Sequence, residues 1–290
     1  MELKAIDLHS HYSTKKGYLW QAPKEIGLAE KFYRYEAKYR TEEEMAQDFR
    51  DAGVKVILDL GFTQHTSIEE AKELHDYVGH LILSYHDVII GGWVALNPRT
   101  GLKGLRELER GLKDLGMTGF AANPTSLNIA PSDEVFYPFY EMCIEAKAPV
   151  LLNVGFTAVG ANQPGGGGRC LDYCHPRYID EVAAKFPELI IIAGRQAWPW
   201  VNDMIATLLH KPNVWNELHG WSPKYLAPEL KWDIGRRLQD KIMFGADYPM
   251  FDYERLFRDW ESEGYKQDIL EKVYYKNAQK LFRNLGRELV

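Results

Sequence analysis

Eight short apolar runs, separated by amphipathic segments of helical period, constrain the fold of this chain more than any other feature. All but the fourth are rich in Val, Ile and Leu, and they are too short for helices, as buried parallel strands are. Strands that alternate with helices pair in parallel through right-handed crossovers. The eight runs span residues 5–11, 54–60, 88–96, 119–124, 149–155, 189–194, 214–220 and 241–247.

The number of repeats selects between two parallel architectures. One unit of strand and helix takes roughly 36 residues, which fits a closed (β/α)8 TIM barrel. An open doubly wound sheet would need a glycine-rich nucleotide turn directly after a strand. The run PGGGGRC at 164–170 lies past the fifth strand and opens no helix, so it is interpreted as an active-site loop rather than a phosphate cradle. We therefore predict one α/β domain over 1–290, a TIM barrel that ends in two closing helices at 253–285.

A long segment interrupts the first repeat of the predicted barrel. Residues 13–40, which include WQAPKE and KFYRYEAKYR, separate the first strand from the first barrel helix. Connections of this length inside compact domains are usually functional. The sequence therefore predicts an inserted lid or interface segment at 13–40.

Composition excludes several classes of partner and location. The 35 Lys and Arg against 41 Asp and Glu give a net charge of −6, without a basic arm or stripe for nucleic acid. Three cysteines are too few for a disulfide scaffold and fit a reducing compartment. The first residues form no signal-peptide core, and no apolar run reaches the ~20 residues that cross a bilayer. We expect a cytoplasmic protein that binds neither nucleic acid nor membranes.

Polar side chains gather where the first and last predicted strands end, which is where TIM barrels place their catalytic residues. Strand alternation predicts that Asp7, His9 and His11 share one face. Two imidazoles at i and i+2 can converge on one metal ion or hold one substrate. Asp247 ends the last strand, across the barrel seam from the two histidines. It can ligate a metal, act as a general base if burial raises its pKa, or simply cap the next helix.

These motifs resemble those of the amidohydrolase-2 branch of the amidohydrolase superfamily, which includes aminocarboxymuconate semialdehyde decarboxylase and resorcylate decarboxylases. The resemblance extends from residue 5 to about residue 285 and rests on DLHSH, GxxxPW, FGADYP and the terminal KNAQKLF. The stretches HPRYIDEVAAKFPELIIIAG and NVWNELHGWSPKYLAPEL resemble a subgroup of hydrolases that act on aromatic and β-keto acyl catabolites. The resemblance implies a metal-dependent TIM barrel.

This chain keeps only part of the metal site that the resemblance implies. The two first-strand histidines and the last-strand aspartate match as His9, His11 and Asp247, for which zinc is the first candidate ion. The histidines expected on the fifth and sixth strands are replaced by Asn153 and Arg195. Asparagine is a poor zinc ligand, and a guanidinium is none because it stays protonated. The replacements therefore favour a metal-free site, and the three matching residues are the predicted ligands if a metal is bound.

Further side chains extend the predicted site toward a substrate. Arg195 offers a bidentate partner for a carboxylate or an oxyanion. Glu217 and His219 share a face of the seventh strand, where either replaces a ligand or acts as an acid or base. Alternatively, Glu217 simply neutralises Arg195. Asn153 and Trp198 complete the predicted substrate-binding set, and the aromatic content suits a planar organic acid.

We interpret the chain as a hydrolase of a small cyclic, aromatic or β-keto organic acid, cleaving a lactone, a thioester or a C–C bond. Asp247 would activate water, His9 and His11 would polarise a carbonyl, and Arg195 would hold a carboxylate or oxyanion. One alternative is a non-oxidative decarboxylase or hydratase of the same family, and another is a catalytically inactive binding barrel. The family often forms dimers, so a homodimer is an open expectation.

Overall fold

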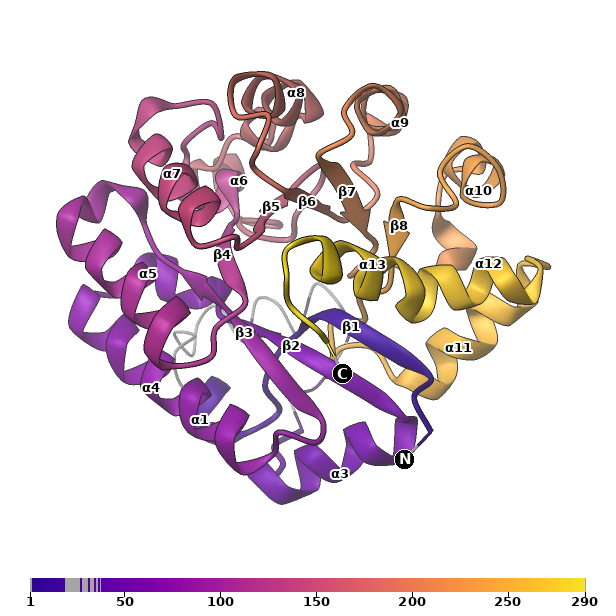
Figure 1. The fold of residues 1–290 in the computed structure, drawn as a ribbon, viewed down its shortest axis with the longest axis horizontal. Coiled ribbons are helices and arrows are strands. Elements are labelled where there is room, and N and C mark those ends of the chain that lie inside the picture. The colour runs from indigo at the N-terminus through magenta and orange to yellow at the C-terminus, as the bar shows by residue number, and fades with distance from the viewer. Residues whose placement is uncertain are drawn as a thin grey trace.

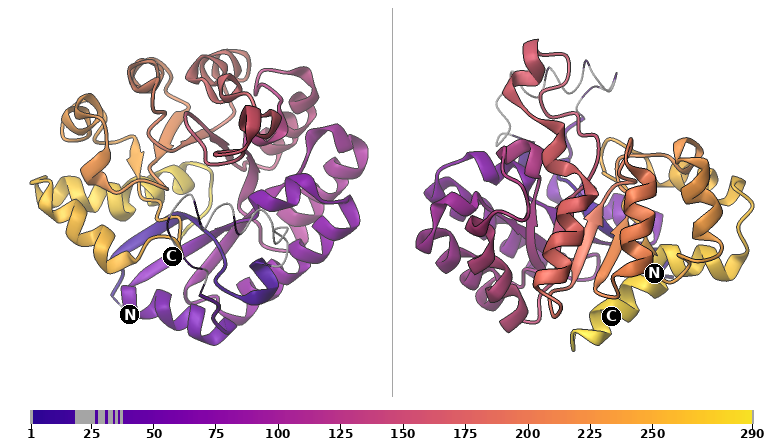
Figure 2. Two further views of the ribbon diagram at one scale, coloured as in Figure 1. Left: turned by 180° about the vertical axis from the view of Figure 1, so that it is seen from behind. Right: turned by 90° about the horizontal axis from the view of Figure 1, so that it is seen from above.

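The chain forms a (β/α)8 TIM barrel, as predicted, in a computed structural model that describes residues 2–18, 27, 31, 34, 36 and 38–289. Eight parallel strands follow one another around the sheet in sequence order, and helices surround them (Figures 1 and 2). Every strand lies within one of the predicted apolar runs. The strands are β1 (Ala5–Ser10), β2 (Val54–Asp59), β3 (Ile89–Ala95), β4 (Gly119–Ala122), β5 (Val150–Asn153), β6 (Ile191–Gly194), β7 (Val214–Glu217) and β8 (Ile242–Met243).

The helices begin and end where the sequence supplies caps. Thr41 and Ser67 each form a capping box with the glutamate three residues later. The first long helix ends at Gly53, whose φ of 68° is the left-handed C-cap conformation that glycine adopts without strain. The helices are α1 (Lys15–Tyr18), α3 (Glu42–Ala52), α4 (Ile68–Ser84), α5 (Leu102–Asp114), α6 (Pro124–Leu127), α7 (Tyr137–Glu145), α8 (Pro176–Lys185), α9 (Val201–His210), α10 (Pro228–Ile234), α11 (Tyr253–Ser262), α12 (Gln267–Glu271) and α13 (Asn277–Asn284). Within the described part of the chain, no helix has the length and apolarity needed to cross a bilayer.

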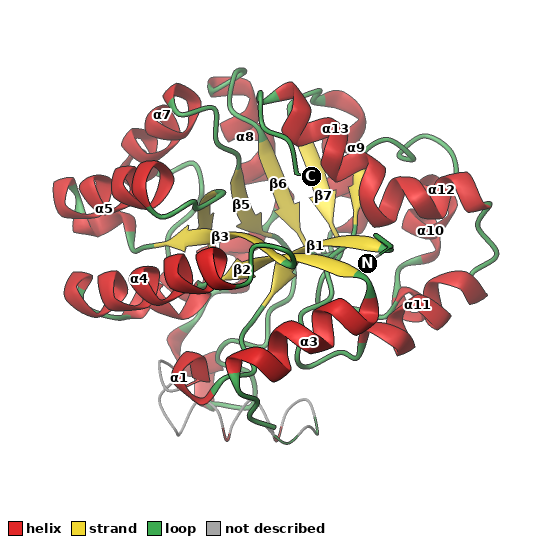
Figure 3. Ribbon diagram, turned by 60° about the horizontal axis from the view of Figure 1, so that its bottom comes forward, coloured by secondary structure: helices red, strands yellow, loops and turns green. Residues whose placement is uncertain are grey.

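The barrel interior is a packed apolar core that the strands enclose (Figure 3). It is continuous with Leu281 and Phe282 of α13, and Leu3, which precedes β1, packs at its edge. Helix α13 therefore covers the amino-terminal end of the barrel, and the opposite end holds the strand termini that form the site. The interior strand residues are Ile6, Leu8, Ile57, Trp93, Ala121, Leu151, Ile192, Trp215 and Met243.

The barrel closes between β1 and the segment that follows β8. Because β8 has only two residues, main-chain hydrogen bonds beyond it complete the seam. Leu8 N–H donates to Phe244 O at 3.1 Å, Asp247 N–H to His9 O at 2.8 Å and His11 N–H to Tyr248 O at 2.7 Å. Main-chain atoms of the predicted site residues thus form the barrel joint itself.

Strand β1 contains an irregularity that redirects its side chains. Its register against β2 shifts between Asp7 and Ser10. Leu8 faces the barrel interior, yet His9 also points inward, toward the site. Simple alternation fails across such a bulge, because the extra residue rotates the strand.

Asp7 consequently points away from the site, and the prediction that it shares a face with His9 and His11 is wrong. Its Oδ2 accepts a hydrogen bond from Tyr253 O–H at 2.7 Å, on the helix side of the barrel wall. Its Oδ1 accepts from the main-chain N–H groups of His9 at 2.9 Å and Ala246 at 3.0 Å. Burial, opposed by these hydrogen bonds, raises the pKa of Asp7 to about 6. Asp7 therefore has a structural role: its hydrogen bonds stabilise the bulge in β1 and the joint between β1 and the segment after β8.

Most of the predicted lid at 13–40 lies outside the described residues. The two ends of the segment meet, because Thr14 pairs with Arg40 in a parallel bridge and Arg40 N–H donates to Ser13 O at 2.8 Å. The glycine run of the predicted active-site loop forms a left-handed turn, in which Gly165 to Gly168 all have φ between 58° and 76°. Asn128 Nδ2 ties this turn to the loop after β4 by donating to Gly168 O at 2.9 Å.

Candidate active site

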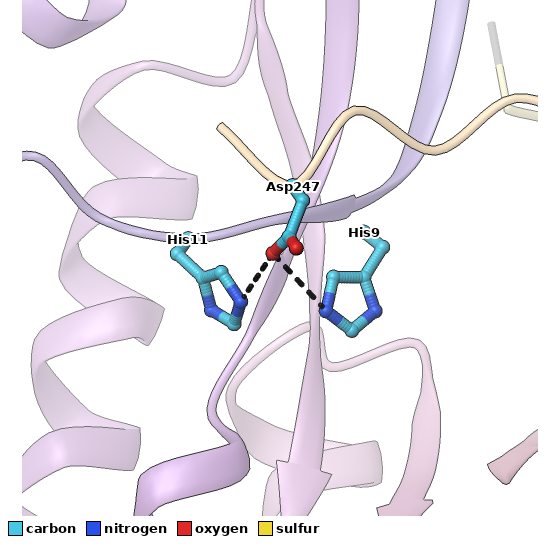
Figure 4. Close-up of side chains that lie close together, drawn as sticks. All are labelled: His9, His11 and Asp247. Carbon is cyan, nitrogen blue, oxygen red and sulfur yellow. Dashed lines mark ion pairs between the residues drawn. The ribbon is translucent and has the colours of Figure 1, made fainter. Parts of the chain in front are cut away.

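The candidate site lies at the carboxyl ends of β1, β7 and β8, where the predicted side chains converge. His9 and His11 come from the first strand and the residues after it, and Asp247 follows the last strand (Figure 4). Asp247 Oδ1 lies 2.9 Å from His11 Nε2 and 4.0 Å from His9 Nε2. The His11 side chain is 17% exposed, whereas His9 and Asp247 are buried. His11 is therefore the member of this group that reaches the open end of the barrel.

Asp59 is a site residue that the sequence reasoning missed. It is the last residue of β2, and its Oδ2 lies 3.5 Å from His9 Nε2 and 3.6 Å from His11 Nδ1. The signal was present, because the strand ends in a carboxylate at the edge where barrels place their catalytic groups. The site thus contains three acidic side chains around His9: Asp59, Glu217 and Asp247.

His219 links two parts of the site. Its ring stacks on His9 with centroids 3.4 Å apart and an angle of 7° between the planes. Arg195 Nε–H donates to His219 Nε2 at 2.8 Å, and His219 Nδ1 lies 2.5 Å from Glu217 Oε1. Because a guanidinium only donates, Nε2 must carry the lone pair, so the imidazole proton sits on Nδ1 and points at Glu217. His219 is therefore a neutral bridge between a cation and a carboxyl group.

Arg195 reaches the same end of the barrel, and within the described part of the chain it forms no ion pair. Its Nη1 donates to the main-chain oxygen of Phe156 at 3.2 Å, and no carboxylate among the described residues lies within ion-pair distance. A Cβ atom on Gly220 would lie 3.0 Å from Asp247 Oδ2 and 3.9 Å from Arg195 Cζ, so both groups border one point. Glu217 and Arg195 form no direct ion pair, because His219 lies between them.

The pKa of Asp247 moves in the direction opposite to the one that a general base needs. Burial alone would raise it, but contact with His11 and the nearby His219 and His9 hold the pKa well below its ordinary value. Burial likewise favours neutral His11, yet contact with Asp247 and the charge of Asp59 raise its pKa to about 9. The pair is thus an aspartate and an imidazolium at neutral pH, and a carboxylate of low pKa is a weak base.

Burial favours the neutral forms of Glu217, His9 and His219, the deeper groups of the site. Burial, opposed by the His219 main-chain N–H and by Arg195, raises the pKa of Glu217 to about 8. Burial and neighbouring positive charge hold the pKa values of His9 and His219 well below their ordinary range. Burial also raises the pKa of Asp59.

A divalent ion fits the residues that the family resemblance assigns to it. The ligand atoms of His9, His11 and Asp247 all lie within 4.8 Å of one another, and ligands of a tetrahedral zinc ion lie about 3.4 Å apart. Asp247 Oδ1 is fully buried, and no donor among the described residues meets hydrogen-bond geometry with it. Two imidazoles and a carboxylate form a common three-ligand zinc set that leaves a position for water or substrate.

The other predicted substrate-binding residues border the same space. A Cβ atom on Gly194 would lie 2.8 Å from Asn153 Oδ1 and 3.0 Å from Glu217 Oε1, so the amide faces the deep part of the site. Trp198 is 49% exposed, and its ring lies 6.1 Å from Phe156 and 6.5 Å from Trp221, centroid to centroid. The segment that carries this aromatic surface also contacts Arg195, whose Nη1 donates to the main-chain oxygen of Phe156.

Comparison with known proteins identifies relatives of this fold. The model of an amidohydrolase family matches residues 6–284. No curated protein sequence gives a significant match. Among solved structures, an uncharacterised TIM-barrel protein of Bordetella bronchiseptica is 20% identical, with a TM-score of 0.73 over 98% of this chain and 100% of that one.

Two further solved structures are decarboxylases. The 5-carboxyvanillate decarboxylase of Novosphingobium aromaticivorans, complexed with manganese, is 18% identical with a TM-score of 0.72, covering 97% of this chain and 96% of that chain. The 2,6-dihydroxybenzoate decarboxylase of Rhizobium is 14% identical with a TM-score of 0.69, covering 98% and 99%. At such identities the likeness shows the common fold.

Proposed function

The chain belongs to the amidohydrolase family and is an enzyme of that superfamily, and from this premise we propose that it is a non-oxidative decarboxylase of a small aromatic carboxylic acid. The observation that carries the proposal is the Arg195 guanidinium, which has no ion-pair partner among the described residues and borders Asp247 at the open end of the barrel. A guanidinium in that position fits an anionic oxygen pair on a substrate. The decarboxylase structures of the same fold support this choice of reaction.

The rim of the site suits an aromatic ring. Trp198 and Phe156 stand in an edge-on arrangement, and Phe156 also supplies the main-chain oxygen that accepts from Arg195 Nη1. Phe156 N–H in turn donates to Trp198 O at 2.7 Å. The aromatic wall and the cation are thus held by one segment, so a planar acid can place its ring on the wall and its anionic oxygens on Arg195.

Decarboxylation exchanges a carboxyl group for a proton. The ring carbon that bears the carboxylate takes up one proton, the bond to the carboxyl carbon breaks, and its electron pair returns to the ring as CO₂ leaves. His11 holds a proton at neutral pH, with a pKa of about 9, and its partly exposed side chain reaches the cavity. We assign the proton donation to His11, with Asp247 holding the imidazolium in place.

His9, His11 and Asp247 are also the residues that would hold a divalent ion, which would polarise a substrate oxygen. Arg195 and the aromatic rim keep the same roles in both forms of the site.

The hydrolase interpretation receives less support than its lyase alternative. It requires Asp247 to take a proton from water, but contact with His11 holds the Asp247 pKa well below its ordinary value. A base of that kind is poorly matched to water activation near neutral pH. The decarboxylase needs Asp247 only as a stable negative charge.

The test is a panel of hydroxybenzoic and methoxybenzoic acids labelled with ¹³C at the carboxyl carbon, incubated in D₂O with protein prepared both with and without added zinc or manganese. We expect labelled CO₂ from at least one acid, with one deuterium at the vacated ring carbon for each CO₂. Arg195→Met should lose at least tenfold in kcat/KM, or about 1.4 kcal/mol of transition-state stabilisation. Turnover of lactones or thioesters in a parallel panel, without CO₂ from any acid, would overturn the proposal in favour of a hydrolase.

A further inference from the structure

We propose that Glu217 and His219 are positioning residues that aim the Arg195 guanidinium and thereby make the site selective for carboxylates. The inference rests on the proposed function, because it takes Arg195 as the substrate-binding cation. It adds a role for two buried side chains that do not touch the substrate. Glu217 and His219 both have no exposed surface.

The direction of the hydrogen bonds fixes the arrangement. Arg195 Nε–H donates to His219 Nε2 at 2.8 Å, so His219 presents its Nδ1–H to Glu217 Oε1. Glu217 Oε2 accepts from the His219 main-chain N–H at 2.9 Å, which prevents the carboxyl group from rotating away. A carboxyl group that orients an imidazole in this way is a common means of fixing a functional group.

These bonds leave one edge of the guanidinium for a ligand. Nε is occupied by His219, and Nη1 donates one hydrogen bond to Phe156 O at 3.2 Å. The described residues provide no acceptor for Nη2. The edge formed by Nη1 and Nη2 therefore remains for the two oxygens of a carboxylate, the geometry in which arginine binds bidentately.

The main chain of Arg195 is held by the same strand as the two positioning residues. Its φ of 79° lies in the left-handed region, which is unfavourable for a non-glycine residue and persists only where surrounding bonds impose it. Arg195 N–H donates to Glu217 O, and Asn216 Nδ2 donates to Arg195 O, both at 2.7 Å. Strand β7 thus holds the main chain of this arginine, and His219, two residues beyond the strand, holds its side chain.

The experiment measures anion selectivity directly, as the ratio of the dissociation constants for benzamide and benzoate. Benzoate carries the carboxylate, and benzamide has nearly the same shape without the charge. The variants are His219→Phe, which keeps a flat ring against His9 but has no acceptor for Arg195, and Glu217→Leu. His75→Phe is the matched control, because His75 is an equally buried histidine paired with Glu107 at 2.7 Å, outside the barrel wall.

We expect the wild type to prefer benzoate, Arg195→Met to lose the preference, and His219→Phe and Glu217→Leu to reduce it about tenfold with benzamide affinity unchanged. Glu217→Gln, which still accepts from Nδ1–H, should recover most of the preference. His75→Phe should lower thermal stability and leave the ratio unchanged. In catalysis, His219→Phe should raise KM with a smaller effect on kcat.

Two results would contradict the inference in distinguishable ways. If the wild type does not prefer benzoate, or if Arg195→Met retains the preference, Arg195 is not a carboxylate site. The positioning role of Glu217 and His219 is then contradicted as well. The second result concerns the positioning role alone. If circular dichroism shows both variants folded, and Arg195→Met loses the benzoate preference while His219→Phe keeps it in full, then Arg195 binds carboxylates but His219 does not position it. If His219→Phe does not fold, Glu217→Leu decides the question, and an unchanged benzoate preference in that variant contradicts the inference.

Discussion

Asp247, where the barrel closes, is constrained in both its main chain and its side chain. Its main chain bonds to β1, its Oδ1 contacts His11, and its φ of 64° is a left-handed conformation. Aspartate and asparagine tolerate that conformation better than most residues. Asparagine is therefore the substitution that removes the charge of Asp247 and leaves the backbone undisturbed.

Asp247→Asn should reduce kcat/KM at least tenfold with little change in the melting temperature, because the amide cannot stabilise the His11 imidazolium. The loss corresponds to about 1.4 kcal/mol or more of transition-state stabilisation. Steady-state kinetics and thermal unfolding of the same preparation provide the check. A variant that retains more than a tenth of the wild-type value would show that the charge of Asp247 is not needed.

The replacement of two expected histidines predicts a gain of function. The double variant Asn153→His with Arg195→His should bind zinc more tightly than the wild type, because it adds two imidazole ligands and removes a cation from the neighbourhood. Competition with a chromophoric chelator measures the affinity, and Asn153→His alone is the control that retains the cation. Equal zinc affinity in the wild type and the double variant would show that neither the charge of Arg195 nor the missing ligands limits metal binding.

At the residue scale, the sequence predicted the site where a motif and a strand end coincide, and it failed where the backbone departs from regular alternation. His9, His11 and Asp247 were predictable because each stands at or just beyond a strand end. Asp7 was misplaced because a bulge in β1 has no signature in the side-chain pattern. Asp59 was overlooked because a single aspartate after an apolar run also reads as the start of a turn.

At the scale of elements, the end of β6 shows why a glycine is needed beside the positioning residues. A Cβ atom on Gly194 would lie 2.8 Å from Asn153 Oδ1 and 3.0 Å from both Glu217 Oε1 and His219 Cε1. Gly194→Ala should therefore displace these side chains and reduce the benzoate preference, with a loss of about 1–3 kcal/mol in the free energy of unfolding from overpacking. Gly264→Ala, where a Cβ would meet nothing but φ is 77°, is the control for backbone strain alone. An unchanged benzoate preference in Gly194→Ala would show that the crowding is relieved elsewhere.

Helices α4 and α5 are joined by a buried ion-pair network that predicts a pH dependence of stability. Burial alone would raise the pKa of Glu107, but hydrogen bonds from His75 and Arg110 lower it from 4.5 to about 2, and Asp76 completes the network by contacting Arg110. The stabilisation is present above pH 4.5 and is lost as the pH falls toward 2. Glu107→Gln should lower the free energy of unfolding by about 3 kcal/mol at neutral pH. Urea unfolding from pH 7 to pH 3 measures it, and the difference from wild type should shrink below pH 4.5; a constant difference would contradict the assignment.

The elements themselves were predictable to different degrees. Apolar runs gave every strand, but only two residues of the run at 241–247 pair as β8, because the chain beyond them bonds to β1 by main-chain groups in an irregular conformation. The 3₁₀ turn Glu134–Phe136 and α7 are separate elements, since Pro138 lacks the N–H that a continuous helix needs. The local sequence pattern therefore predicts where strands and helices lie, whereas their ends depend on contacts with residues distant in the sequence.

For the molecule as a whole, α13 closes the amino-terminal end of the barrel by packing side chains against its interior core. Phe282 is fully buried in the interior core at the amino-terminal end, on the opposite side from the site. Phe282→Ala should lower the free energy of unfolding by about 3–5 kcal/mol. Because the cavity lies far from Asp247, kcat/KM per folded molecule should stay within twofold of wild type. A large loss of catalysis at full folding would show that α13 also shapes the active end.

The joint between β1 and the chain after β8 has a consequence for how such a barrel can diverge. Its hydrogen bonds use the main chains of His9, His11 and Asp247, whereas the side chains of the same residues form the candidate site. Side chains at the open end of the barrel can therefore be substituted without breaking the hydrogen bonds that close it. Because main chain and side chain have separate roles, such a site can acquire new activities. Arg195 and Asn153, which stand in place of the two expected histidines, are side-chain substitutions of this kind. They change the polar groups at the open end of the barrel and leave the barrel itself unchanged.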